Sequence, residues 1–171
     1  MAFKIGAVDS GDKVIMGESE NNINAGVGPL RVLLVEDNFI NQELARIILE
    51  QDGNDVTTAD DGLGALEVLA RDEFDVVIMD VQMPMMDGIT ATGLIRKCEK
   101  EKDAVFAEEG DLLRKLNAKI FGGHVVIIAM TANAMAGDRE KCLDAGMDDY
   151  ITKPFEPAEF LAALQRVSGI R

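Results

Sequence analysis

The sequence predicts an α/β fold in which a five-stranded parallel sheet carries helices on both faces. Short apolar segments alternate five times with helical patterns from Leu30 onward, and this alternation is typical of repeated strand and helix units. The apolar segments are continuous, as in Val76-Val77-Ile78-Met79, which is typical of strands buried on both faces of a sheet. Polar residues end four of these segments, and ligands of such folds bind at the carboxyl ends of the strands.

The first strand is predicted at residues 31–35. Asn38 can then cap a helix that continues to about Gln51, with Gly53 after its end. One face of this helix is apolar and contains Ile40, Leu44, Ile47 and Ile48. This spacing predicts an amphipathic helix.

The second strand is predicted near residues 55–59, followed by a helix over about residues 62–71. The apolar residues of that helix are Leu63, Leu66 and Leu69. The third strand, residues 74–79, leads to Asp80, and Asp87-Gly88 opens the third helix.

The last two units complete the pattern. The fourth strand is predicted at residues 125–130, and a helix over about residues 134–145 ends at Gly146. The fifth strand covers about residues 149–152, and Glu156 or Pro157 starts the last helix.

A helical insert is predicted between the third helix and the fourth strand, at about residues 99–123. This stretch is longer than a usual connection. Gly110 breaks a charged, helix-prone segment, Asp111 can cap a further short helix, and Gly122-Gly123 stops it. The apolar stripe of that helix consists of Leu112, Leu113, Leu116 and Ile120. The stripe is expected to cover the parent domain, and an exposed patch would instead favour a partner site.

Residues 1–29 are predicted to form an N-terminal extension with linker composition, and residues 30–171 to form one domain. Within the extension, residues 3–8 and 13–16 flank Asp9-Ser10-Gly11-Asp12, a pattern compatible with a hairpin. An isolated hairpin is marginal in water, so it would have to pack on another element.

The bulk properties exclude several classes of function. The chain has 17 Lys and Arg against 31 Asp and Glu, a net charge of −14, so no nucleic-acid contact is expected. Its apolar runs are too short to cross a bilayer and its start does not resemble a signal peptide, so a cytoplasmic location without membrane contact is expected. Cys98 and Cys142 form no CxxC pair and are expected to be free thiols.

Three acids, a hydroxyl and an ammonium are expected at the carboxyl edge of the sheet. Asp37 and Asp80, supported by Glu36, offer hard carboxylate oxygens that suit Mg²⁺. Taken alone, each acid could equally cap a helix or lie in a loop. Thr131 and Lys153 end the fourth and fifth segments, where both side chains can contact a phosphoryl oxygen.

Four motifs occur in a fixed order at these strand ends. They are Glu36-Asp37-Asn38, Met79-Asp80-Val81-Gln82-Met83-Pro84-Met85-Met86-Asp87-Gly88, Ala129-Met130-Thr131-Ala132 and Asp148-Asp149-Tyr150-Ile151-Thr152-Lys153-Pro154-Phe155. Together they closely resemble the receiver domain of two-component response regulators, most of all receivers of hybrid sensor histidine kinases. The resemblance covers about residues 30–168 without the insert. It implies a flavodoxin-like, doubly wound (βα)5 fold with strand order 2-1-3-4-5.

The resemblance also implies roles for the acids and the lysine. By position, Asp80 would be the phosphoacceptor and Lys153 the ammonium that contacts the phosphoryl group. Glu36 and Asp37 would bind Mg²⁺ together with Asp80 and the backbone carbonyl of Gln82.

The same resemblance implies a conformational switch. Thr131 would be the switch hydroxyl and Tyr150 the switch aromatic, while Gln82 and Asn133 would tune the lifetime of the phosphoryl group. The bond between Lys153 and Pro154 is expected to be cis, as in the family.

The phosphoryl group is expected to come from a phosphohistidine of a partner, either a sensor histidine kinase or a histidine phosphotransfer protein. His124 is the only histidine, and its place at the start of a strand gives it the role of a strand-end residue rather than a donor. No ATP-binding motif of a kinase is present, so the chain is expected to be a signalling module that catalyses only its own phosphorylation and slow dephosphorylation. The first helix, near Phe39, Ile40 and Leu44, is predicted to help dock the partner.

The resemblance further allows a homodimer through the surface formed by the helix at residues 134–145, the fifth strand and the last helix. It leaves open whether the chain is a stand-alone regulator or a fragment of a hybrid kinase.

Other functions on this architecture fit less well. An aspartyl-nucleophile phosphohydrolase needs an acid two residues after the nucleophile, where this chain has Gln82. A flavin site needs a loop rich in Ser, Thr or Gly after the first strand, whereas Glu36-Asp37 would repel a phosphate there. A receiver that works without phosphate would normally have lost an acid or the lysine, and this chain keeps both.

Overall fold

The computed structural model describes residues 28–102, 110–132 and 136–167. Its five strands form one sheet in the order β2-β1-β3-β4-β5, and all neighbouring strands are parallel. The predicted fold class and strand order are therefore confirmed. The hairpin expected in the extension lies outside the described residues, as does Asn133.

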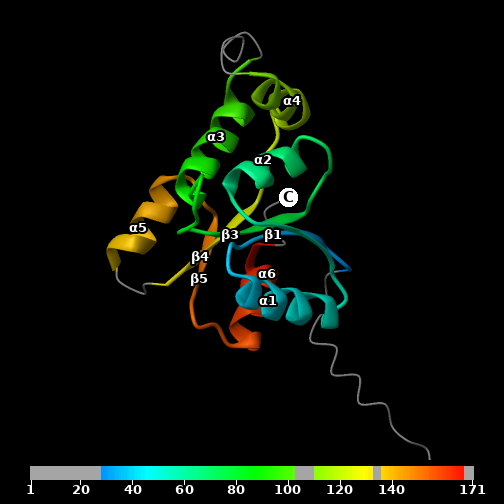
Figure 1. The fold of residues 1–171 in the computed structure, drawn as a ribbon, viewed down its shortest axis with the longest axis vertical. Helices are drawn as coiled ribbons and strands as arrows, with labels where there is room; N and C mark the ends of the chain where they lie inside the picture. The colour runs from blue at the N-terminus through cyan, green and yellow to red at the C-terminus, as the bar shows by residue number, and fades with distance from the viewer. Residues whose placement is uncertain (1–27, 103–109, 133–135, 168–171) are drawn as a thin grey trace, which may run out of the picture.

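The elements follow the predicted alternation (Figure 1). The strands are β1 (Arg31–Val35), β2 (Asp55–Ala59), β3 (Val76–Asp80), β4 (Ile127–Thr131) and β5 (Asp149–Thr152). The helices are α1 (Phe39–Gln51), α2 (Gly62–Leu69), α3 (Gly88–Lys100), α4 (Asp111–Ile120), α5 (Ala136–Asp144) and α6 (Pro157–Val167). Asp80 and Thr131 are the last residues of β3 and β4, so each of these strands ends one residue later than the sequence predicted.

The sheet separates two buried apolar clusters. Along β1, Leu33 and Val35 belong to the cluster beneath α2 and α3, whereas Val32 and Leu34 belong to the cluster beneath α1 and α6. Figure 1 shows α2 and α3 on one side of the sheet and α1 and α6 on the other. Side chains that alternate between two covered faces explain why the strands have continuous apolar sequences.

Helix α1 begins as predicted but turns a different side to the sheet. The side chain of Asn38 caps it by accepting hydrogen bonds from the first turn. Its buried residues are Gln42, Ala45, Ile48 and Leu49. Ile40, Leu44 and Ile47 are 75%, 50% and 44% exposed, so of the predicted apolar face only Ile48 lies against the sheet. On α2, Leu63 is likewise 39% exposed.

The insert is present as a helix, with two corrections to its boundaries. α3 continues to Lys100, slightly beyond the predicted start of the insert at about residue 99. Gly110, at φ +102°, precedes the first residue of α4, so Asp111 belongs to the first turn and does not cap the helix. A positive φ is easily adopted by glycine, which explains why the chain changes direction there.

The apolar stripe of α4 covers the parent domain, as expected. Leu113, Leu116 and Ile120 belong to the buried cluster beneath α2 and α3. The Asn117 side-chain nitrogen also donates to the backbone oxygens of Cys98 and Glu101, at 2.6 and 2.7 Å. These bonds satisfy carbonyls at the end of α3 that have no partner within the helix.

A buried ionic network ties α3 to the strands that follow it. The Arg96 guanidinium lies 2.6 Å from Glu99 Oε1 and 3.0 Å from Asp148 Oδ2, and it donates to the Gly146 carbonyl at 2.8 Å. Nε2 of His124 lies 2.7 Å from Asp148 Oδ1. His124 lies between α4 and β4, and its contact with Asp148 links the chain before β4 to the chain before β5.

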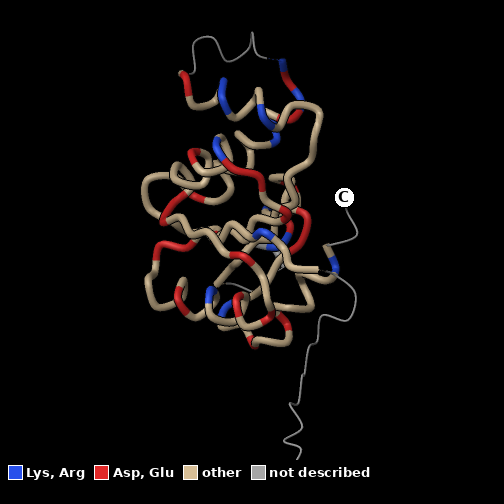
Figure 2. The backbone as a smooth tube through the Cα atoms, turned by 90° about the vertical axis from the view of Figure 1, so that its right-hand side faces the viewer, with Lys and Arg blue, Asp and Glu red and all other residues tan. Residues whose placement is uncertain are grey.

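None of the described helices is long and apolar enough to cross a membrane. Figure 2 shows acidic segments around the body of the molecule and several basic segments at the end formed by α4 and the end of α3.

Candidate functional site

Three carboxylates meet at the carboxyl edge of the sheet. Glu36 follows β1 and Asp80 ends β3, and both side chains are buried, at 1% and 5% exposure. Asp37 is exposed beside them. One carboxylate oxygen from each of the three lies within 4.8 Å of the others. The predicted acid cluster is therefore formed, because β1 and β3 are neighbours in the sheet.

Lys153 reaches this cluster from the end of β5. Its Nζ lies 2.5 Å from Glu36 Oε2 and 2.7 Å from Asp80 Oδ2, and the bond to Pro154 is cis as expected. Burial by itself lowers the pKa of Lys153, but the hydrogen bonds and charges of Asp80 and Glu36 outweigh it and raise the pKa above its ordinary value. The lysine is therefore held as a cation.

Three acids face one ammonium in this part of the structure. Carboxylates held this close repel one another, and a bound cation removes that cost. Hard oxygen donors of this number fit a divalent cation. The acid cluster of Glu36, Asp37 and Asp80 is thus a candidate metal site.

Glu36 is fixed by a residue that the sequence did not single out. Gln42 is 8% exposed on the sheet side of α1, and its Nε2 donates to the Glu36 carbonyl at 2.9 Å and to Asp60 Oδ1 at 3.0 Å. The Glu36 backbone nitrogen also donates to the Ala59 carbonyl at 3.1 Å. A polar residue on the buried face of a helix was the available signal, because such groups are buried only when bonded.

The loop after β3 is shaped to lie close to Asp80. The Gln82 backbone nitrogen donates to Asp80 Oδ1 at 3.2 Å, and Met85 adopts φ +61°. A Cβ on Gly88 would lie 2.2 Å from the Asp80 backbone oxygen, so only glycine fits there. This close approach lets Asp87 start α3 directly beside the strand end, where its side chain caps the helix.

Thr131 and Tyr150 lie on the same face of the sheet. Thr131 is 4% exposed at the end of β4, and Tyr150 on β5 is in register with Ala129. Side chains two residues apart on a strand share a face, so Tyr150 lies beside Ala129 and one step from Thr131. The predicted hydroxyl and aromatic are therefore close neighbours on β4 and β5.

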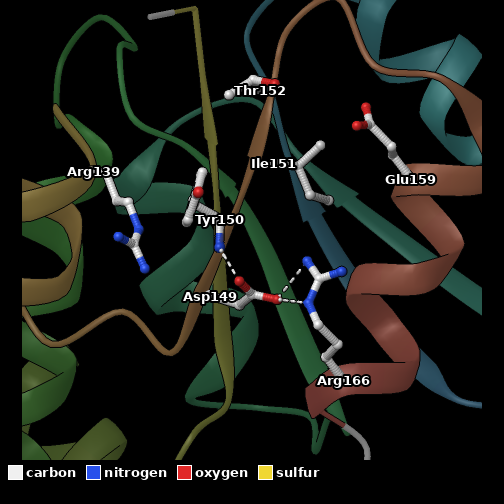
Figure 3. Close-up of a pocket in the computed structure, with 7 residues that line it drawn as sticks. All are labelled: Arg139, Asp149, Tyr150, Ile151, Thr152, Glu159 and Arg166. Carbon is white, nitrogen blue, oxygen red and sulfur yellow. Dashed lines mark hydrogen bonds and ion pairs between the residues drawn. The ribbon is translucent and has the colours of Figure 1, made fainter. Parts of the chain in front are cut away.

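A cavity of about 490 Å³ opens next to Tyr150 (Figure 3). It is lined by Arg139, Asp149, Tyr150, Ile151, Thr152, Glu159 and Arg166. The Arg166 guanidinium is paired with Asp149 Oδ2 at 2.8 Å, while the Arg139 guanidinium lies over the Tyr150 ring. No pattern in the sequence distinguishes Arg139, because a charged residue on an exposed helix face is ordinary.

Comparison with known proteins places the chain in a known family. The model of the response regulator receiver domain family matches residues 32–107 and 110–165. The chain belongs to this family. The gap in the match, residues 108–109, falls between α3 and α4.

The most similar curated relatives include large kinases. Hybrid signal transduction histidine kinase I of Dictyostelium discoideum is 40% identical over 134 residues, which are 75% of this chain and 7% of that protein. Histidine kinase 2 of Arabidopsis thaliana is 37% identical over 137 residues, 80% of this chain and 12% of that protein. The chain thus spans only a small part of these relatives.

Solved structures of receivers have the same fold. The receiver domain of sensor histidine kinase PA1611 from Pseudomonas aeruginosa, with a magnesium ion coordinated in its active-site cleft, is 39% identical with a TM-score of 0.63; the match covers 83% of this chain and 99% of that one. The receiver domain of the response regulator Ssk1 of Saccharomyces cerevisiae, crystallised with the histidine phosphotransfer protein Ypd1, is 31% identical with a TM-score of 0.60; the match covers 82% and 88% of the two chains.

Proposed function

We propose that this receiver accepts a phosphoryl group on Asp80 from a phosphohistidine of a partner protein. One observation carries the proposal: Asp80 is a buried carboxylate with the Lys153 ammonium 2.7 Å from one oxygen and two further acids within 4.8 Å. An acid in this setting can act as a nucleophile while a cation neutralises the charge on the group that it attacks.

The residues suggest how the transfer proceeds. An oxygen of Asp80 attacks phosphorus in line with the leaving imidazole, so that an O–P bond forms as the N–P bond breaks. Lys153, held charged by its two acidic neighbours, stabilises the negative charge on the transferred oxygens. Glu36, Asp37 and Asp80, with the Gln82 carbonyl, would hold Mg²⁺, which supplies further charge neutralisation when bound. The structure of the PA1611 receiver with magnesium supports this choice of metal.

Intact mass measurement tests the proposal. The wild type, incubated with Mg²⁺ and a small phosphodonor such as acetyl phosphate, is expected to gain one phosphoryl group, and Asp80→Asn is expected to gain none. Asp87→Asn is the matched control, because it changes an acid on the same loop that only caps α3. An equal gain in the wild type and Asp80→Asn would overturn the assignment, as would a gain that persists after Mg²⁺ is chelated.

We further propose that the partner docks on an apolar patch of α1. Phe39, Ile40, Leu44 and Ile47 are 73%, 75%, 50% and 44% exposed. The patch begins three residues after Glu36, so a protein bound to it lies next to Asp80. The complex of Ypd1 with the Ssk1 receiver supports a histidine phosphotransfer protein or a histidine kinase as the partner.

Two phosphodonors separate docking from chemistry. Ile40→Ser should slow transfer from a phosphorylated histidine phosphotransfer protein and leave phosphorylation by acetyl phosphate unchanged. An equal rate from the protein donor in wild type and variant would exclude α1 as the docking helix.

Phosphorylation is proposed to act through Thr131 and Tyr150. The phosphoryl oxygens attract the Thr131 hydroxyl, and the space that Thr131 leaves lets Tyr150 turn inward, which changes the surface of α5, β5 and α6. A homodimer through that surface stays a prediction. Sedimentation of the protein with and without a phosphodonor tests it.

A further inference from the structure

The guanidinium of Arg139 lies over the ring of Tyr150. The distance from Arg139 Cζ to the ring centroid is 5.2 Å. A cation at this distance from the face of an aromatic ring is attracted by the ring's negative face. Figure 3 shows the two side chains facing each other between α5 and β5, away from Asp149 and Arg166.

Two arginines, Arg139 and Arg166, line the cavity, and they differ in their ion pairs with the described residues. Arg166 shares the cavity but is paired with Asp149 at 2.8 Å. Arg139 makes no ion pair with any residue that the structure describes, and its contact with Tyr150 is with the ring itself. The attraction between the Arg139 guanidinium and the Tyr150 ring therefore favours the present position of the ring.

Tyr150 lies beside β4 on the face of the sheet that carries Thr131. Tyr150 is only partly buried, it packs against the cluster beneath α2 and α3, and it is in register with Ala129 on β4. Ala129 is fully buried and offers only a methyl group, so no long side chain of β4 separates Tyr150 from Thr131 on this face. A ring that moves toward Thr131 moves along the sheet and away from Arg139 on α5.

We propose that Arg139 holds Tyr150 in its outward position and so opposes the switch in the unphosphorylated receiver. The inference rests on the proposed function, because it assigns Arg139 a part in the Thr131 and Tyr150 step. A ring turned toward Thr131 would leave this contact, so the contact stabilises the outward position, which is the one that the ring has in this structure. A cation–π contact at a partly exposed site corresponds to a change of about two- to five-fold in the ratio of the two states.

The chain is suited to a direct test because Tyr150 is its only tyrosine and it has no tryptophan. Two NMR signals are followed. One comes from the Tyr150 ring, which Arg139 contacts, and the other comes from the Thr131 methyl group. The wild type with and without acetyl phosphate and Mg²⁺ defines the two end positions of each signal. The variants are Arg139→Gln, Arg139→Lys and, as a matched control from the same cavity, Arg166→Gln.

Without phosphodonor, both signals of Arg139→Gln should move together toward the phosphorylated position, by the amount that a two- to five-fold population change gives. Arg139→Lys, which keeps the cation, and Arg166→Gln should remain near the wild-type position. A ring signal that moves while the Thr131 methyl stays fixed would show a local effect and overturn the proposal. An equal shift in Arg166→Gln would also overturn it.

The proposed function fails in a different way. If the wild type gained no phosphoryl group by mass, the assignment of Asp80 would be refuted. The coupling of Arg139 to Tyr150 and Thr131 would still be read from the joint movement of the two signals in Arg139→Gln without any phosphodonor.

Discussion

The ammonium of Lys153 balances part of the negative charge of the acid cluster. Among the described residues its ammonium is the cation in contact with the acid cluster, and it contacts Glu36 and Asp80. Burial lowers its pKa, and the hydrogen bonds and charges of the two acids reverse that effect. The lysine therefore stabilises the folded state as long as it is charged.

The sign of this effect gives a pH dependence. Because the folded pKa of Lys153 lies above its ordinary value of 10.5, its stabilising contribution is complete below that pH and is lost as the pH rises through the folded pKa. Without Mg²⁺, the difference in unfolding free energy between wild type and Lys153→Met should be constant from about pH 7 to about pH 10 and then fall. Urea titrations at several pH values measure it.

The control for this titration is Lys115→Met, which changes an exposed lysine of α4. It should change the unfolding free energy by less than about 0.5 kcal/mol at every pH. A difference for Lys153→Met that declines already between about pH 7 and about pH 9 would contradict a lysine held charged by its neighbours.

Two glycines of α3 test the close approach at Asp80. A Cβ on Gly88 would lie 2.2 Å from the Asp80 backbone oxygen, whereas a Cβ on Gly93 would meet nothing within 4 Å. Gly88→Ala should therefore destabilise the fold by about 1–3 kcal/mol or more and disturb phosphorylation. Gly93→Ala should stabilise it by about 0.5–1 kcal/mol, because alanine favours a helix. Opposite signs in urea titrations are the expected result, and equal effects would refute the steric argument.

At the scale of elements, the sequence predicts strands better than helix faces. Strands β1 and β5 have the bounds that the sequence predicts, because a polar residue marks the carboxyl end of each apolar segment. Helix α1 is apolar on two sides, one facing the sheet and one facing solvent. Periodicity alone cannot distinguish the two sides, because Ile40 and Leu44 lie at helical spacing from Ile48.

Contacts between distant elements set a second limit on prediction from sequence. Arg139 and Tyr150 meet across α5 and β5, and Asn117 of α4 caps the end of α3. Each residue taken alone is an ordinary polar residue of a helix. The acid cluster could be predicted because the strand ends of a parallel sheet always share an edge, whereas no such rule fixes which helix residues meet.

The inserted helix α4 is expected to be part of the cooperative core. Leu116 is fully buried in the cluster beneath α2 and α3. Leu116→Ala should lower the unfolding free energy by about 2–5 kcal/mol, because it removes buried methyl groups and leaves a cavity. Leu63→Ala is the matched control at 39% exposure and should cost much less. Similar small losses in both variants would show that α4 unfolds separately from the receiver.

At the scale of the whole molecule, the negative charge sets the response to cations. The chain has a net charge of −14, and Figure 2 shows acidic segments distributed around the sheet. Any salt reduces this repulsion by screening. A bound Mg²⁺ adds stability only by its affinity for the folded acid cluster, and at a hundred times its dissociation constant the gain is about 2.7 kcal/mol.

Asp37→Asn separates the two effects. Asp37 is the exposed member of the acid cluster, within 4.8 Å of Glu36 and Asp80 at their carboxylate oxygens. Without Mg²⁺, removing the charge of Asp37 should raise the unfolding free energy by a few tenths of a kcal/mol, because one of three mutually repelling carboxylates is neutralised. With Mg²⁺, the same change should remove most of the stability that the metal adds to the wild type. Asp72→Asn, an exposed acid at the other end of the sheet, should keep the full Mg²⁺ gain. The measurement is thermal or urea unfolding with Mg²⁺ and with NaCl at the same ionic strength. If NaCl matched Mg²⁺ in the wild type, or if Asp37→Asn and Asp72→Asn responded alike, the acid cluster would not be the metal site.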